Sequence, residues 1–123
     1  MAYDNPINQT ITLPAAAVST AATLVSVVGP AGKVGRLEGI GAVVTTSTTV
    51  AATELRVGSA SDADAYGTLS VPIATAGAAA AYNSATISDI DANLMPADTA
   101  VLIASDGGST AGAADVVVTI AWF

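Results

Sequence analysis

Short apolar blocks alternate along the whole chain with groups of Gly, Pro, Asp, Asn and Ser, a pattern typical of all-β proteins. Several blocks also alternate internally, as strands with one buried face do. Within residues 53–57, Leu55 and Val57 share one face and the charged residues share the other. The predicted strands are residues 10–13, 23–28, 34–44, 53–57, 67–71, 84–90, 100–104 and 113–123. This spacing predicts an all-β fold, an antiparallel β-sandwich of about eight short strands with a jelly-roll-like topology.

Other segments interrupt the strand pattern. Residues 14–22 start with Pro and continue with good helix formers, so a short helix and a loop leading into the next strand are the alternatives there. Residues 76–81 are Ala-rich with an internal Gly, and we expect a flexible surface loop. Gly39 and Gly41 interrupt the third predicted strand, which predicts a β-bulge or a bend. Residues 29–33 contain the Gly and Pro of a turn and lack the spacing of a phosphate-binding loop.

The apolar residues of the chain are numerous but small. They make up 52% of the sequence, yet 28 of them are Ala and 14 are Val. Because the hydrophobic gain scales with buried area, such side chains form a thin core, and we expect burial in a homo-oligomer to add stability. The sequence ends on Trp122 and Phe123, which we expect to be buried in the chain's own sandwich rather than in a partner.

A chain of 123 residues has room for one hydrophobic core. We therefore assign residues 9–123 to a single β-sandwich domain and residues 1–8 to an extended N-terminal arm, in which an Asn-Pro pair favours extended backbone. An arm with few apolar side chains is expected to order on a neighbouring surface, and a frayed terminus is the alternative. The predicted partner-binding residues of the arm are Tyr3, Asn5, Pro6 and Ile7.

The charge balance and the missing residue types disfavour most kinds of chemistry. Three basic residues stand against ten acidic ones, for a net charge of −7, whereas binding to nucleic-acid phosphates needs clustered Lys and Arg. The chain has no His, the commonest general base and transition-metal ligand, and no Cys for disulfides or thiolate sites. We therefore expect a protein that is not an enzyme, has no cofactor and does not bind nucleic acid.

The hydropathy of the chain predicts a protein that is made and kept soluble. Its start has no basic residue and no apolar segment of the kind that a secretory signal needs. The longest uninterrupted apolar run, residues 78–82, is far shorter than the roughly 20 residues of a membrane span. We expect no membrane partner.

Two Asp-x-Asp pairs, Asp62 with Asp64 and Asp89 with Asp91, are the remaining candidates for chemistry. Paired carboxylates bind Ca²⁺ or act in glycoside hydrolysis. The first pair does not continue as an EF-hand loop, because position 12 is Ile73 rather than Glu. Both pairs lie between predicted strands, where Asp is favoured in turns. We expect solvated turn residues, and an incidental cation site is the alternative.

The C-terminal part of the sequence, residues 94–123, carries a distinctive order of motifs. Pro96-Ala97-Asp98-Thr99 leads into an apolar strand, a loop rich in Gly, Ser, Thr and Ala follows, and an alternating strand ends in two aromatic residues. Residues 33–37 and 55–58 have the same character, as does the Ala-, Thr-, Gly- and Val-rich composition. In these features the chain resembles capsid decoration (cement) proteins and related head proteins of tailed bacteriophages.

The resemblance implies a structural virion protein that decorates and stabilises the outside of a phage capsid by binding the major capsid protein. It implies a jelly-roll or related β-sandwich, commonly a homotrimer and sometimes a dimer, that is assembled in the host cytoplasm and located on the outer capsid surface. No catalytic or cofactor-binding residue follows from it. The alternatives are a head-fibre or tail component and a carbohydrate- or Ca²⁺-binding β-sandwich module.

Overall fold

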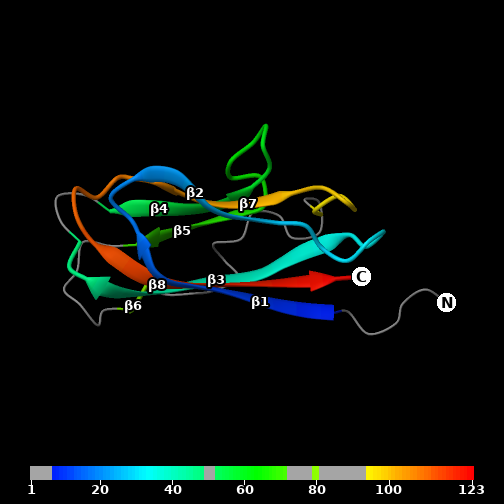
Figure 1. Ribbon diagram of the computed structural model, residues 1–123, viewed down its shortest axis with the longest axis horizontal. Coiled ribbons are helices and arrows are strands. Elements are labelled where there is room, and N and C mark those ends of the chain that lie inside the picture. The colour runs from blue at the N-terminus through cyan, green and yellow to red at the C-terminus, as the bar shows by residue number, and fades with distance from the viewer. Residues whose placement is uncertain (1–6, 49–51, 72–78, 81–93) are drawn as a thin grey trace.

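Two antiparallel sheets packed face to face form the protein (Figure 1). The structure is a computed structural model, and it describes residues 7–48, 52–71, 79–80 and 94–123. Its strands are β1 (Ile7–Ala17), β2 (Ala21–Val27), β3 (Gly35–Thr46), β4 (Thr53–Gly58), β5 (Gly67–Val71), β6 (Ala79–Ala80), β7 (Val101–Asp106) and β8 (Ala113–Trp122). Within this described part of the chain no helix is long and apolar enough to cross a membrane.

The strand pairing is that of a long antiparallel hairpin rolled up on itself. Strand β1 pairs with β8, β2 with β7, β3 with β6 and β4 with β5. Rolling adds the pairs β3–β8 and β4–β7, so that the sheet orders become β1-β8-β3-β6 and β2-β7-β4-β5. This is the order of a jelly roll. The predicted all-β, jelly-roll-like antiparallel sandwich is confirmed.

The core lies between the inner faces of the two sheets, where the predicted alternation places the larger apolar side chains. In β8, Val116, Val118 and Ile120 are fully buried, whereas Val117 between them is exposed. In β4, Leu55 and Val57 are fully buried. Small residues allow the sheets to approach closely, and area burial by many Val, Ile and Leu side chains supplies the driving force.

β-Bulges correct the alternation where strict pleating would turn apolar residues outward. In β3 the register shifts between Leu37 and Gly39, so that both Leu37 and the even-numbered residue Ile40 point into the core. The bulge predicted at the glycines of this strand is confirmed. In β1 the register shifts between Leu13 and Ala16, with Ala15 at φ 49°. The sequence did not predict this second bulge.

Four expectations about local structure need correction or lie outside the described residues. Residues 14–17 continue β1 as a strand, because pairing with β8 outweighs local propensity. The helix expected over residues 14–22 is therefore wrong, and the alternative loop leading into the next strand is confined to residues 18–20. Ile7 and Asn8, assigned to the arm, belong to β1. Ala79–Ala80, expected in a flexible loop, form β6 against β3. The predicted strand 84–90 lies outside the described residues.

Candidate functional site

The Asp-x-Asp pair on the described part of the chain lies in a hydrogen-bonded turn. Asp62 and Asp64 are exposed in the connection between β4 and β5. The backbone N–H of Ser59 donates to the carbonyl oxygen of Asp62 at 2.8 Å, and the N–H of Asp62 donates to Ser59 Oγ at 3.2 Å. Among the described residues no group of three or more His, Cys, Asp or Glu could hold a metal ion. Asp89 and Asp91 lie outside the described residues.

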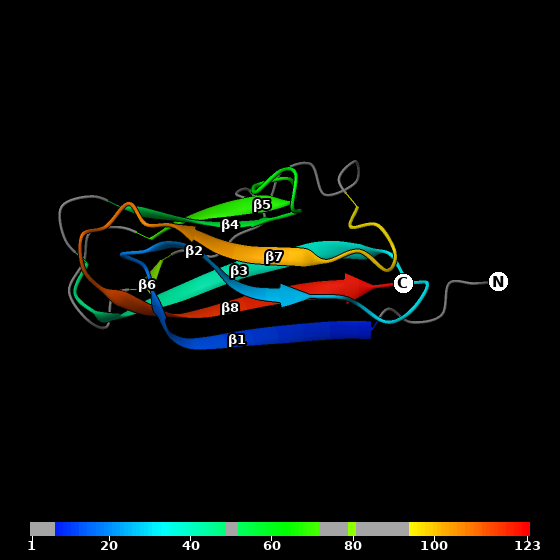
Figure 2. The same ribbon diagram turned by 45° about the horizontal axis from the view of Figure 1, so that its top comes forward.

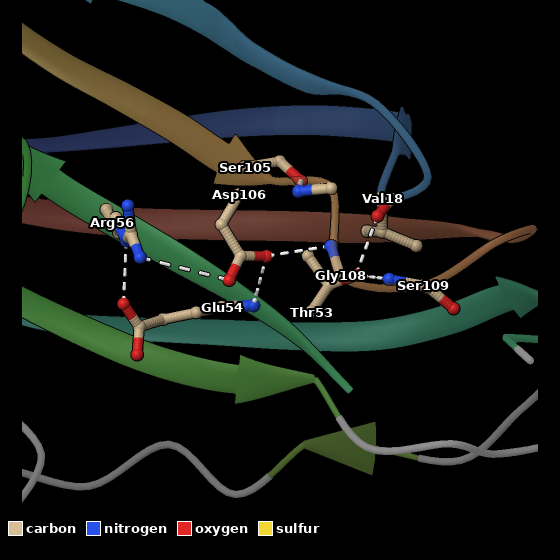
Figure 3. A network of polar contacts seen from close by, with 9 residues as sticks. Val18, Thr53, Glu54, Arg56, Ser105, Asp106, Gly108 and Ser109 are labelled. Atoms are coloured by element: carbon tan, nitrogen blue, oxygen red, sulfur yellow. Dashed lines mark hydrogen bonds and ion pairs between the residues drawn. The ribbon is translucent and has the colours of Figure 1, made fainter. Parts of the chain in front are cut away.

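A polar network beside β4 is the second candidate for chemistry (Figure 3). Its buried centre is Thr53, whose hydroxyl donates to the Val18 carbonyl at 2.6 Å and accepts from the Ser109 N–H at 2.9 Å. The hydroxyl thereby joins the turn after β1 and the turn after β7 to the start of β4. Both contacts involve backbone groups, which would otherwise be buried without partners.

The charged part of this network is also occupied by structural contacts. Asp106 Oδ1 accepts from the N–H groups of Glu54 and Gly108, both at 2.9 Å. Arg56 lies 2.7 Å from Glu54 Oε1 and 3.9 Å from Asp106 Oδ2. The hydrogen bond with Glu54 raises the pKa of Arg56. These side chains close a turn and pair charges on the outer sheet surface, and they form no arrangement suited to general acid or base catalysis.

Exposed apolar side chains gather instead at one end of the sandwich, where the described ends of the chain lie together (Figures 1 and 2). We call this surface the terminal end. It comprises Ile7, Val28, Leu94 and Phe123, which are 48%, 57%, 38% and 37% exposed. The other exposed large apolar residues of the described chain, Val43 and Val117, lie on strands of the β1 sheet away from this end. Exposed apolar side chains at one end of a molecule are candidates for contact with another protein.

Backbone pairing brings these four distant residues together. Ile7 at the start of β1 lies opposite Trp122 near the end of β8. Residue 34 exchanges two backbone hydrogen bonds with Phe123, and the neighbouring Gly35 exchanges two with Met95, beside Leu94. The terminal end is therefore built on a rigid ladder, which suits a surface that must keep its shape on binding.

An open groove of about 530 Å³ runs across the terminal end between the start of β1 and the end of β2. Its lining residues are Ile7, Asn8, Gln9, Thr10, Val28, Gly29, Pro30 and Trp122. The indole N–H of Trp122 donates to Gln9 Oε1 at 2.9 Å, which fixes the ring. A Cβ at Gly29 would lie 2.5 Å from that ring, so only glycine allows the turn to close over it. The floor of the groove is thus one firmly held aromatic side chain.

The positively charged Arg36 side chain lies at the border of the terminal end, beside Phe123. The Arg36 guanidinium lies 5.8 Å from the centre of the Phe123 ring, within the range of a cation–π contact. The same side chain pairs with Glu38 at 2.9 Å. Arg36 therefore places a positive charge over Phe123 at the start of β3.

The structure brings together part of the predicted site and adds residues that the sequence did not point to. Ile7 lies in the groove, whereas Tyr3, Asn5 and Pro6 lie outside the described residues and stay predictions. The expected burial of Trp122 is confirmed at 1% exposure, and that of Phe123 is wrong. The contributions of Val28 and Leu94 were missed. Only the pairing of distant strands assembles the surface, so no local motif could have found it.

No known protein family and no curated protein matches the sequence. A chain of the cyanophage Pam1 capsid asymmetric unit is similar in structure, with a TM-score of 0.44 and 19% sequence identity. The similarity covers 96% of this chain and 84% of that one. At this level it adds no argument about function.

Proposed function

We propose that this chain is a structural virion protein of a tailed bacteriophage that decorates the outside of the capsid by binding the major capsid protein. The order of motifs over residues 94–123 supports this proposal by its resemblance to decoration proteins. The observation that carries it is the apolar terminal end, because it is a contact surface without catalytic groups. We propose no enzymatic activity and no cofactor.

In this proposal the terminal end faces the capsid. Ile7 and Val28 supply the most exposed apolar area of this end, and they border the groove that would receive a side chain of the shell. The predicted arm residues Tyr3, Asn5 and Pro6 directly precede Ile7 in the sequence, so they would extend the same contact.

The acidic character of the chain also fits an outer position. A net charge of −7 keeps particles apart in solution, and it gains nothing from contact with packaged DNA. The surface that we assign to the capsid is instead rich in uncharged side chains, because Ile7, Val28 and their neighbours in the groove carry no charge.

The test is binding to purified heads of the parent phage that lack the protein. In I7S/V28S the terminal end loses apolar area, and we expect the affinity for heads to fall by at least about tenfold, as loss of central interface residues does. The matched control V43S/V117S removes two exposed valines from elsewhere on the surface and should bind within about twofold of the wild type. Co-sedimentation with heads gives both affinities.

Each other outcome counts against a defined part of the proposal. Wild-type protein that does not bind heads contradicts the decoration role, and binding to purified tails instead would identify a tail component. Equal losses in the two double variants would show that the terminal end is not the capsid-facing surface. Circular dichroism melting of each variant ensures that folded proteins are compared.

A further inference from the structure

The two edge strands on one side of the sandwich, β1 and β2, carry no charge. No Asp, Glu, Lys or Arg occurs between Asp4 and Lys33, although 13 charged residues are spread over the rest of the chain. We call this surface the β1–β2 side. The sheet orders place β1 at the edge of one sheet and β2 at the edge of the other, and the two strands follow each other in the chain.

The core is only partly covered on this side. Ile11 and Leu13 of β1 and Leu24 and Val25 of β2 pack against the core but are only half-buried. At the opposite edge, Leu69 and Val71 of β5 are buried. A second surface placed against the β1–β2 side would therefore bury apolar area that the isolated chain leaves accessible.

Half of the β1–β2 side lacks the usual protection of a sheet edge. Natural edges are guarded by Lys, Pro or bulges, which prevent a foreign strand from pairing. Here Pro14 and the bulges at Leu13/Ala16 and Thr23/Val25 guard the half near the β1–β2 turn. The half nearer the terminal end, Ile7–Leu13 of β1 with the last residues of β2, has no such guard.

We propose that the β1–β2 side is where copies of this chain bind one another, with β1 of one copy alongside β2 of the next. This inference rests on the proposed function only in that the copies would assemble on a capsid. The absence of charge favours another copy as the occupant, because two molecules of net charge −7 can meet here without bringing acidic side chains together. Asp106 and Asp115 lie toward the guarded half and Asp98 lies beside the loop after β2, and each of the three accepts a backbone hydrogen bond.

The strand directions decide how the copies are arranged. Strands β1 and β2 run in opposite directions along the sandwich (Figures 1 and 2). A rotation axis parallel to the strands keeps every direction unchanged, so β1 of one copy meets β2 of its neighbour in the antiparallel sense. Repetition of this head-to-tail contact closes a ring. All copies in the ring then present the terminal end on the same face, as simultaneous binding to one capsid requires.

The experiment compares single Lys substitutions on the two sides by light scattering. T10K places a Lys on β1 and S26K places one on β2, and both sites are exposed. The control S70K changes a matching exposed Ser on β5, the other edge of the β2 sheet, and T45K changes an exposed Thr on β3. We expect wild type, S70K and T45K at one fixed multiple of 11.9 kDa, and T10K and S26K each at 11.9 kDa.

Mixing the two blocked variants tests the contact itself. T10K keeps β2 free and S26K keeps β1 free, so an equimolar mixture has one unblocked contact and should form a two-copy species that neither variant forms alone. Loss of assembly in T10K but not in S26K would show β1 pairing with itself and overturn the proposal. Wild type at 11.9 kDa at every concentration, or unchanged assembly in both variants, would overturn it as well.

The outcome is distinguishable from a failure of the proposed function. If the wild type forms rings that do not bind heads, the decoration role is contradicted and the contact between copies stands. If the protein binds heads but its T10K and S26K variants keep the wild-type mass, the contact between copies is contradicted and the decoration role stands. If either variant fails to melt cooperatively, T12K on β1 or S26R on β2 takes its place, both at exposed positions of the unguarded half.

Discussion

The β1–β2 side and the side formed by β4 and β5 show two ways of finishing the edge of the same sandwich. On the β4–β5 side the inward residues Leu55, Leu69 and Val71 are buried, and Arg56 with Glu54 pairs charges on the outer face. On the β1–β2 side the inward residues remain half-buried and no charge is present. A thin Val- and Ala-rich core can thus be closed on one edge while the other edge stays suited to a partner.

Stability and assembly therefore depend on different sides of the sandwich. Residues of the β4–β5 side stabilise the isolated chain, because their burial is complete without a partner. Residues of the β1–β2 side contribute less until another copy covers them. Only the β1–β2 side is therefore expected to make the unfolding free energy depend on protein concentration.

The largest effect is expected from a matched pair of core truncations. L55A removes a fully buried side chain on the β4–β5 side and should cost about 2–5 kcal/mol of unfolding free energy. L24A removes a half-buried one on the β1–β2 side, and at low protein concentration it should cost about 1 kcal/mol. Urea unfolding at several concentrations measures both, and the L24A cost should rise with concentration. Equal costs at low concentration would contradict the difference between the two sides.

A smaller effect is expected at Thr53, where one hydroxyl links the start of β4 to the turns after β1 and β7. T53V keeps the shape of the side chain but removes the hydroxyl, and with it the hydrogen bonds to the Val18 carbonyl and the Ser109 N–H. We expect a loss of about 1–3 kcal/mol in unfolding free energy. The control T68V, at a half-buried position of β5, should stay within about 0.5 kcal/mol of the wild type. A T53V variant as stable as T68V would show that the hydrogen bonds of the Thr53 hydroxyl do not stabilise the fold.

The smallest effect concerns alkaline pH and the β4–β5 side. Burial, and then the charge of Asp62, raises the pKa of Tyr66 above the usual value of about 10. The folded protein therefore holds this proton more tightly than the unfolded chain does. The stabilisation that this difference in pKa contributes is fully present below about pH 10. It is lost as the pH rises through the pKa of Tyr66 in the folded protein. Urea unfolding from pH 8 to 11 should show this loss in the wild type and less of it in Y66F; identical pH profiles would refute the effect.

The sequence predicted the sandwich because its strongest signal is local. Residues such as Leu55 and Val57 alternate with the charged Glu54 and Arg56, and period-two alternation needs no knowledge of distant contacts. The turn at Gly107, with φ 68°, is likewise encoded by its own residue type. The expectation that the chain is not an enzyme rests on composition alone, with no His and no Cys, and stays a prediction.

Tertiary pairing decided the rest. Pro14 and the Ala residues after it have no local preference for a strand, yet the β8 neighbour and a bulge keep them in β1. Ile7, Val28, Leu94 and Phe123 are distant in sequence, and only the strand order places them at one end of the sandwich. The uncharged stretch before Lys33 is visible in the sequence, but its position on two adjacent sheet edges is not. Which strand lies at an edge depends on long-range hydrogen bonding, and no local pattern contains that information.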